Sequence, residues 1–458
     1  MRRALPPLLL LTACSRPPAI APTEEALRAA LAGRSKVVRL PAATIEIGRE
    51  VAVSREVQID GGGARLHAAP GFRGRALLLV QSAARIRMRD FSIDGNRAAI
   101  EKSAGLPPSN VPFARFTAGN GILIENSSEV EIAKVAFSEI AGFAILVNAS
   151  RVVRIEGVRV ENSGSRNAAG RNNATGGILI EEGSSLFDIR GCALRGIWTH
   201  SLYTSPRNSK GRISGSRFEE IGRDAIQIGH ATEVEVVDNA GRRIGFPTDA
   251  VDIEAQAVPV ALDTSGNTDR CVYARNKFED VNGKCIDLDG FHHGEVRGNS
   301  CVNRQPVEAY PFGGVGIVFN HFNPDMESEG IVVEGNEIDG PNFGGIFVIG
   351  SGHRITGNKL RNLNRAHCNE EAARFGCYYP AEQPDMLRSG IYLGRGTVRP
   401  APVKGARIER NEISGFKMAE RCILAAPGVS IGDNLITGNR CESSPPPPPG
   451  THPAPTPR

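Results

Sequence analysis

Gly335-Asn336-Glu337-Ile338 returns 22 residues later as Gly357-Asn358-Lys359-Leu360, and again as Arg410-Asn411-Glu412-Ile413. Two further pairs of asparagines are 23 residues apart, Asn276 with Asn299 and Asn411 with Asn434. The longer interval from Asn299 to Asn336 fits one repeat with an inserted loop. A fixed period of roughly 20 to 50 residues is typical of solenoids, in which similar units stack along one axis.

The apolar residues inside each unit alternate with a period of two, which is typical of short β-strands. Examples are Ile226/Ile228, Ile286/Leu288, Ile346/Val348 and Ile391/Leu393. A unit of 22 to 23 residues cannot bury its apolar face alone, so stacked units must close one continuous core. Three short strands and three turns fill that length, which predicts one coil of a single-stranded parallel β-helix with coils about 4.8 Å apart. A leucine-rich repeat has a similar period, but it requires leucines at positions where this chain has Ile, Val and Gly.

The recurring asparagine then falls at the same turn of every coil. Its amide can bond to the amide in the coil above and in the coil below, so the sequence predicts an asparagine ladder along the axis.

Length, composition and charge agree with an all-β solenoid. The chain has 458 residues, and its 52 glycines and 5% aromatic content favour many tight turns around aliphatic packing. A formal net charge of +4 gives no indication of a nucleic-acid partner. No apolar run reaches the roughly 18 residues of a transmembrane helix. We expect a monomer.

The first residues have the order of an export signal. Arg2 and Arg3 precede an apolar stretch, Leu8 to Leu11, which is followed by Thr12-Ala13-Cys14. This ending resembles the lipobox of bacterial lipoproteins, which implies that Cys14 becomes the lipidated first residue and anchors the protein to a membrane. Ser15 is compatible with the outer membrane. An ordinary signal peptide with an incidental Cys is the alternative, and it would leave the protein periplasmic or secreted.

These features divide the chain into four parts. Residues 1–13 are a signal peptide, 14–22 a tether, 23–442 the β-helix domain and 443–458 a disordered proline-rich tail.

Eight cysteines remain after Cys14, an even number that permits up to four disulfides in an exported protein. Cys368 and Cys377 flank a short insertion and are the pair we expect. A cysteine zinc site is disfavoured because no C-x-x-C pairs occur.

The N-terminal part predicts how the solenoid begins. Thr23 to Leu31 reads as a short amphipathic helix, with Thr23 as the N-cap and Gly33 beyond its end, which would cover the open end of the core. Together with Val37–Pro41, Ile59–Ala64 and Phe91–Asn96, it resembles the start of pectate-lyase-like right-handed parallel β-helix proteins. The resemblance extends over roughly residues 23–441 and implies that fold. It leaves the reaction open, because such coils carry lyases, hydrolases, epimerases and non-enzymatic adhesins.

Alternation along the strands predicts one outward-facing surface. It is apolar at both ends and polar in the middle. Its expected members are Leu123, Leu146, Leu179, Glu181, Tyr203, Gln227, Asp287, Asp289, Val318, Asn320, Phe347 and Tyr392. Five of the nine histidines, His200, His230, His292, His293 and His321, fall beside its polar middle.

The candidate catalytic residues are Asp287, Asp289, His292, His230 and His321. Asp287 and Asp289 lie two apart on one strand, with Cα atoms about 6.6 Å apart, a spacing compatible with the two carboxyl groups of an inverting glycosidase. A histidine near carboxylates is favoured as a cation and suits proton donation. The alternatives are acids that simply face water and histidines that hold a turn.

The candidate substrate-binding residues surround this pair. They are Trp198, His200, Tyr203, Gln227, His293, Asn320 and Glu181. A core position for the single Trp is an equal alternative. Asp252, Glu254 and Asp263 lie in the intervening coil, but an insertion leaves their register open.

The predicted function is an exported enzyme that acts on a polysaccharide in this groove, as a glycoside hydrolase or a polysaccharide lyase. The alternative is a carbohydrate-binding or cell-surface protein without catalysis. Glu181, Glu182, Asp224 and Asp287 are hard oxygen donors, so Ca²⁺ is a cofactor that the sequence leaves open.

Overall fold

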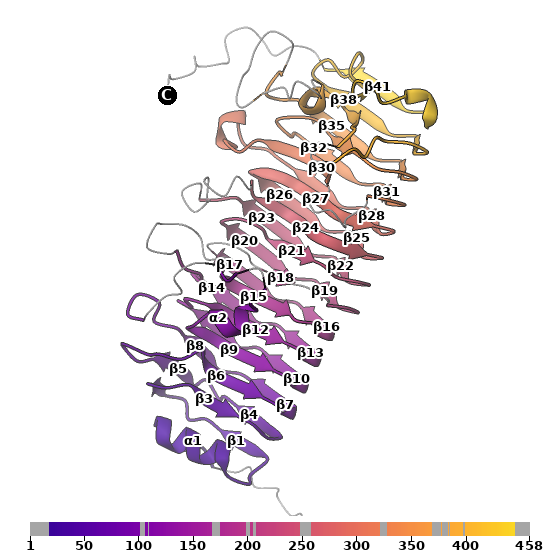
Figure 1. Ribbon diagram of the computed structural model, residues 1–458. Helices are drawn as coiled ribbons and strands as arrows, with labels where there is room; N and C mark the ends of the chain where they lie inside the picture. Colours follow the sequence, from indigo (N-terminus) through magenta and orange to yellow (C-terminus); the bar gives the residue numbers. More distant parts are fainter. Residues whose placement is uncertain are drawn as a thin grey trace, which may run out of the picture.

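The chain forms a right-handed parallel β-helix, as predicted, seen in a computed structural model (Figure 1). The structure describes residues 18–100, 106–108, 110–166, 175–197, 202–204, 208–247, 258–320, 328–368, 377, 383, 385–396 and 399–444. None of the described helices combines the length and apolar character needed to cross a bilayer.

The solenoid begins with the predicted helix, α1 (Glu24–Ala32). The Thr23 side chain accepts a hydrogen bond from the Ala26 amide at 3.2 Å, which satisfies one free amide of the first turn. Leu27 and Leu31 are buried against the first coil. Helix α1 therefore closes the end of the core (Figure 1).

Three parallel sheets run the length of the described chain, and each complete coil contributes one strand to each sheet. Sheet 1 contains β1 (Val37–Arg39), β4 (Val57–Asp60), β7 (Ala84–Arg89), β10 (Ser128–Ala133), β13 (Arg151–Glu156), β16 (Ser185–Arg190), β19 (Arg212–Ser214), β22 (Glu235–Val237), β25 (Val272–Ala274), β28 (Glu295–Arg297), β31 (Val332–Glu334), β34 (Arg354–Thr356), β37 (Arg407–Glu409) and β40 (Leu435–Thr437).

Sheet 2 follows sheet 1 in every coil. It contains β2 (Thr44–Ile47), β5 (Arg65–Ala68), β8 (Ser92–Asp94), β11 (Ala136–Ser138), β14 (Arg159–Glu161), β17 (Ala193–Ile197), β20 (Arg217–Ile221), β23 (Ala240–Ile244), β26 (Lys277–Val281), β29 (Ser300–Val302), β32 (Glu337–Asp339), β35 (Lys359–Leu363), β38 (Glu412–Gly415) and β41 (Arg440–Ser443).

Sheet 3 completes each coil and carries the candidate site. It contains β3 (Val51–Val53), β6 (Ala76–Gln81), β9 (Asn120–Glu125), β12 (Phe143–Asn148), β15 (Gly176–Glu181), β18 (Leu202–Thr204), β21 (Ile226–Gly229), β24 (Val260–Asp269), β27 (Gly283–His292), β30 (Gly314–Asn320), β33 (Ile346–Val348), β36 (Ile391–Leu393) and β39 (Ile423–Ala425). Short helices α2 (Phe113–Phe116), η3 (Val307–Ala309), η4 (Met386–Arg388) and η5 (Ile431–Asp433) interrupt the coils.

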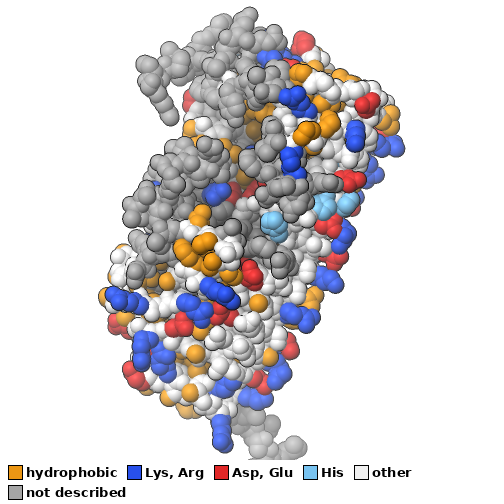
Figure 2. Space-filling model, viewed as in Figure 1, with side chains coloured by type: hydrophobic (Ala, Val, Ile, Leu, Met, Phe, Trp, Pro, Cys, Tyr) orange, Lys and Arg blue, Asp and Glu red, His pale blue; other side chains and the backbone are white. Residues whose placement is uncertain are grey.

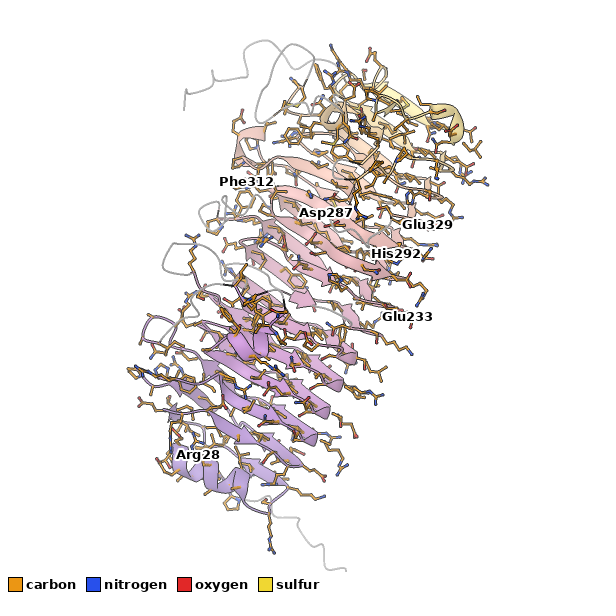
Figure 3. All side chains as sticks on the ribbon, in the orientation of Figure 1. Arg28, Glu233, Asp287, His292, Phe312 and Glu329 are labelled. Carbon is orange, nitrogen blue, oxygen red and sulfur yellow. A yellow bond between two sulfur atoms is a disulfide. The ribbon has the colours of Figure 1, made fainter. Side chains whose placement is uncertain are left out.

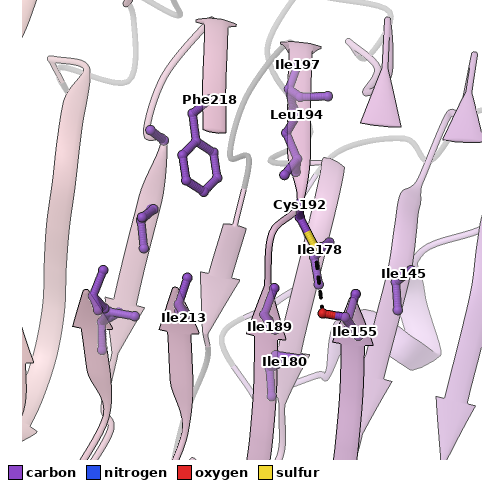
Figure 4. Close-up of a cluster of buried hydrophobic side chains, with 14 of the residues drawn as sticks. Ile145, Ile155, Ile178, Ile180, Ile189, Cys192, Leu194, Ile197, Ile213 and Phe218 are labelled. Atoms are coloured by element: carbon purple, nitrogen blue, oxygen red, sulfur yellow. Dashed lines mark hydrogen bonds between the residues drawn. The ribbon is translucent and has the colours of Figure 1, made fainter. Parts of the chain in front are cut away.

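The core consists of aliphatic columns, because parallel register places like residues above one another. Ile145 pairs with Ile178, and Ile155 pairs with Ile189, which in turn pairs with Ile213. Figure 4 shows these side chains pointing into the space between the sheets. The outer surface of the solenoid mixes acidic and basic side chains (Figure 2).

The asparagine ladder is confirmed between sheets 1 and 2. The Asn336 side-chain oxygen accepts from the amide and the side chain of Asn299 at 2.9 and 3.0 Å, and Asn336 makes the same bonds to Asn358. The ladder contains Asn239, Asn276, Asn299, Asn336, Asn358, Asn411 and Asn439.

The prediction that Asn434 continues this ladder is wrong. Asn411 bonds to Asn439 instead, at 2.9 Å. Gly438-Asn439-Arg440-Cys441 repeats the local pattern of Gly335–Ile338, and the η5 insertion lengthens this repeat. Asn434 instead occupies another turn, where its side-chain oxygen accepts from the Ala406 amide at 2.9 Å.

The predicted disulfide Cys368–Cys377 is confirmed, with Cα atoms 5.6 Å apart. Two further disulfides join Cys285 to Cys301 and Cys422 to Cys441. Cys192 and Cys271 are buried free thiols, so the eight cysteines form three disulfides rather than the four that their number permits. Disulfides are typical of exported proteins.

His353 makes stability depend on pH. Its Nδ1 accepts from the Ile331 amide at 3.2 Å, its Nε2 lies 2.8 Å from the Ile349 carbonyl, and burial lowers its pKa to about 4. Between its ordinary pKa of about 6.5 and pH 4, the unfolded chain takes up a proton that the folded chain does not. The free energy of unfolding should therefore fall by up to about 3 kcal/mol from this group as the pH decreases through that range.

The variant His353→Asn tests this contribution, because Asn434 makes the equivalent bond in a later coil. We expect denaturant unfolding of the variant to lose less stability between pH 7 and pH 4.5 than the wild type does. Equal losses in both proteins would assign the acid sensitivity to other groups.

Candidate functional site

The outer face of sheet 3 carries one column of residues in register, as predicted. From the N-terminal side it reads Leu79, Leu123, Leu146, Leu179, Tyr203, Gln227, Asp263, Asp287, Val318, Phe347, Tyr392. The column is apolar at both ends and polar in the middle. Its leucines pack under α2, with Phe113 and Ala114.

Asp263 and Asp287 are directly paired on β24 and β27. Paired residues of adjacent strands lie about 4.8 Å apart, so both carboxyl groups leave the same face side by side. Asp263 is 8% exposed and Asp287 is 5% exposed. Two acids this close and this buried cannot both be ionised at low cost.

Three polar groups surround the pair. The Gln227 amide donates to Asp263 Oδ2 at 2.6 Å. The Lys284 ammonium forms an ion pair with Asp287 Oδ2, while Asp287 Oδ1 is buried without a hydrogen-bond partner among the described residues. Asp224 is buried beside them and accepts from the Val260 amide at 3.0 Å.

The pKa values follow from this arrangement. Burial, reinforced by the charges of Asp224 and Asp287, raises the pKa of Asp263 well above its ordinary value. Burial also raises the pKa of Asp287, although Lys284 opposes that shift. Against its own burial, the neighbouring Asp287 and Asp263 raise the pKa of Lys284, so Lys284 stays charged. The site therefore favours one proton on Asp263 and a carboxylate at Asp287.

A second outer column lies two residues further along each strand. Ser265, Asp289 and Asn320 are paired in it, and Asp289 and Asn320 are half-buried. The predicted partner acids, Asp287 and Asp289, thus lie on one face of one strand.

The predicted histidines are not gathered around Asp287 in the described part of the chain. His292 lies five residues further along β27, at most roughly 16 Å away along the strand (Figure 3). His292 and His293 instead lie beside Asp269, at distances of 3.6 and 3.1 Å. The His230 ring lies over Gly266 of the next coil, where an added Cβ would stand 2.3 Å from Nε2.

Glu181 is buried in a structural contact. Its two carboxylate oxygens accept from the Phe113 and Ala114 amides, both at 2.9 Å, and Asn148 donates to it at 3.0 Å. Glu181 holds the first turn of α2, and its carboxylate is occupied by these structural contacts. Glu181, Glu182, Asp224 and Asp287 do not form one donor group close enough to share Ca²⁺ in the described structure.

Several predicted residues lie outside the described residues. These are Cys14, Trp198, His200, Asp252, Glu254 and His321. Tyr203 is placed by its backbone in β18, where it pairs with Gln227.

An apolar cleft of about 430 Å³ adjoins the acids on the C-terminal side. Lys284 and Phe312 both line it, and Figure 3 shows Phe312 beyond Asp287, toward the edge of the sheet. Its other main lining residues are Val318, Phe343, Phe347, Leu387 and Tyr392. The Tyr392 hydroxyl is buried there without a hydrogen-bond partner among the described residues. The cleft is lined by residues of β27, β30, β33 and β36, and it meets the acid pair at Lys284, which pairs with Asp287.

The roles of Asp263 and Lys284 and the depth of the cleft were missed from the sequence. A signal for Asp263 exists, because Leu262-Asp263-Thr264 has the pattern of Ile286-Asp287-Leu288 and of Ile226-Gln227-Ile228. Aligning these three segments would have placed Asp263 beside Asp287.

Comparisons with known proteins agree with the fold. The family model described as "Right handed beta helix region" matches residues 109–246. The Dettilon tailspike protein is similar over 89% of this chain and 66% of its own, with a TM-score of 0.52 and 12% identity. This chain therefore spans just under two thirds of that tailspike.

PfbA, a surface adhesin of Streptococcus pneumoniae, is similar over 74% of this chain and 87% of its own, with a TM-score of 0.51 and 14% identity. An endo-xylogalacturonan hydrolase from Aspergillus tubingensis has a TM-score of 0.49 at 11% identity, over 69% of this chain and 90% of its own. No curated protein sequence matches the chain. At these identities the similarity shows the fold alone.

Proposed function

We propose that the protein is an exported enzyme that cleaves a polysaccharide by hydrolysis on the outer face of sheet 3. The observation that carries the proposal is the buried pair Asp263 and Asp287, with Lys284 against one acid and Gln227 against the other. Two carboxyl groups whose surroundings separate their proton affinities are what acid–base hydrolysis of a glycoside requires.

In this mechanism Asp263 is the general acid and Asp287 the general base. Asp263 gives its proton to the glycosidic oxygen, whose bond to the anomeric carbon breaks. Asp287 takes a proton from the water whose oxygen bonds to that carbon. Lys284 keeps Asp287 ionised, and Gln227 orients Asp263. From the residues predicted by sequence, Asp287 and Gln227 keep a role in this scheme, and Asp289 and Asn320 lie where a neighbouring sugar would pass.

A lyase is less well supported by this geometry. A lyase acting on a uronate needs a free cation to neutralise the sugar carboxylate and a base to remove a proton. Among the described residues Lys284 is the cation paired with these acids, and its charge is already taken by Asp287. The cleft beyond Lys284 would hold the apolar face of a sugar ring or an apolar substituent.

Export and the anchor belong to the same proposal. The three disulfides support an oxidising compartment, and the order of residues at Arg2, Arg3 and Thr12-Ala13-Cys14 supports a lipid anchor at Cys14.

The test is incubation of the purified protein with a panel of neutral and acidic polysaccharides. We expect new reducing ends without ultraviolet-absorbing unsaturated ends on at least one polymer. Unsaturated ends would show a lyase. Binding without either product, on every polymer bound, would favour the non-catalytic alternative.

A further inference from the structure

The ends of β24 and β27 bring three potential metal ligands together, outside the acid pair. Asp269 is the last residue of β24 and pairs with His292, the last residue of β27; His293 follows directly. Figure 3 shows His292 at the edge of the solenoid, away from Asp287. Asp269 and His292 are largely buried, with side chains 18% and 16% exposed, and His293 is 54% exposed.

The distances fit a small transition-metal ion. Asp269 Oδ1 lies 3.6 Å from His292 Nε2 and 3.1 Å from His293 Nδ1, and one donor atom of each residue lies within 4.8 Å of the other two. Zinc–ligand bonds of about 2.0–2.1 Å in a tetrahedron place neighbouring donors roughly 3.3 Å apart. The three atoms therefore already stand near the spacing that one ion requires.

His292 is oriented as a ligand. Its Nδ1 lies 3.1 Å from the Gly290 carbonyl oxygen, which accepts only if Nδ1 carries a proton. A metal-binding histidine commonly donates its other ring nitrogen to a carbonyl in this way. In the neutral ring, Nε2 then presents a lone pair toward the carboxylate oxygen of Asp269. A cation between these two atoms, which are 3.6 Å apart, would be bound by both.

The other two donors are also held in place. The Arg270 guanidinium pairs with Asp269 Oδ2, which leaves Oδ1 for the histidines, and Arg270 also reaches Glu233 at 3.5 Å. The His293 ring lies against Gly330 of the next coil, where an added Cβ would stand 3.1 Å from Cδ2. Glu329, whose carbonyl accepts from the His293 amide at 2.8 Å, is exposed one coil further along.

We propose that Asp269, His292 and His293 bind one divalent transition-metal ion, Zn²⁺ or a similar ion, with the remaining position open to water. Two imidazoles and one carboxylate suit such ions better than Ca²⁺ or Mg²⁺, which prefer oxygen ligands alone. The site is separate from the acid pair and does not depend on the proposed hydrolysis. It replaces the sequence-based roles of His292 and His293 in the groove.

The experiment is titration of the untagged, full-length protein with Co²⁺, followed by visible absorption, and with Zn²⁺, followed by calorimetry. We expect one ion per chain and d–d absorption bands that Zn²⁺ displaces. His292→Ala and His293→Ala should each weaken binding at least about a hundredfold, while Ca²⁺ should not compete.

His67→Ala is the matched control, because His67 also lies beside a carboxylate, Asp94, at 3.3 Å, but has no second histidine. It should bind Co²⁺ as the wild type does. Unfolding curves check that the variants remain folded. The proposal is overturned if the wild type binds no ion at millimolar Zn²⁺, or if the double variant of His292 and His293 binds as tightly as the wild type.

Discussion

Asp287→Asn and Asp263→Asn are each expected to lower polysaccharide turnover at least about a hundredfold, because each removes one half of the acid–base pair. The measurement is the release of reducing ends under saturating substrate. Wild-type activity should also decline as the pH rises through the raised pKa of Asp263, since the acid then loses its proton.

Stability distinguishes a catalytic role from a structural one. Burial beside Asp224 and Asp287 disfavours the ionised form of Asp263, so at neutral pH the folded chain has to take up a proton there that the unfolded chain does not hold. An uncharged Asn at this position removes that cost. We therefore expect Asp263→Asn to unfold at the same denaturant concentration as the wild type, or a higher one.

Two controls sharpen the assignment. The variant Asp289→Asn tests whether the catalytic pair is Asp287 with Asp289, as the sequence suggests, or Asp263 with Asp287. Asp188→Asn changes a partly exposed acid of sheet 1 and should leave turnover unchanged. Near-normal turnover in both Asp263→Asn and Asp287→Asn would dismiss the proposed site.

Asn336→Leu is expected to destabilise the protein by about 3 kcal/mol or more, the largest effect on stability that we predict. Asn336 lies in the interior of the ladder, and the substitution removes its side-chain bonds to Asn299, to Asn358 and to the Val296 carbonyl. The buried Asn299 amide then loses its acceptor and the Val296 carbonyl loses its side-chain donor, at about 1–3 kcal/mol for each buried group left without a partner. The Asn299 side chain keeps its bonds to Tyr273 and Asn276. The measurement is denaturant unfolding of the wild type and the variant.

The chain offers a matched control at the same turn. Ser216 occupies a ladder position in an earlier coil, where its hydroxyl accepts from the Cys192 amide at 3.1 Å. Asn336→Ser should therefore cost clearly less than Asn336→Leu. If the two variants are equally destabilised, the loss comes from packing and not from the ladder.

The fold could be predicted because one asparagine and a set of alternating apolar residues recur with the coil. The helix over Thr23–Leu31, the ladder and Cys368–Cys377 depend on local patterns that need no knowledge of distant contacts. Asn434 was misplaced because spacing alone does not show where an insertion lies within a repeat. The Gly-Asn pattern at Gly438-Asn439 identifies the ladder position where spacing does not.

The site was predicted only in part, for a physical reason. The outer column from Gln227 to Tyr392 follows from alternation, but the coil around Asp263 carries an insertion that hid its register. The strands β24 and β27 are also longer than the predicted strands, with 10 residues each. They continue past the acids, so His292 and His293 lie at the edge of the solenoid and not in the groove.

The two free cysteines in the described part of the chain have a consequence for oxidative folding. Cys192 lies in the ladder column beside Ser216, while Cys271 accepts from the Val234 amide through its sulfur at 3.3 Å. Burial raises the pKa of Cys192 to about 11 and that of Cys271 to about 12. Thiol–disulfide exchange requires a thiolate, and neither sulfur supplies one at neutral pH while the coils are stacked. The assembled solenoid thus protects its three correct cross-links from scrambling by its own spare thiols.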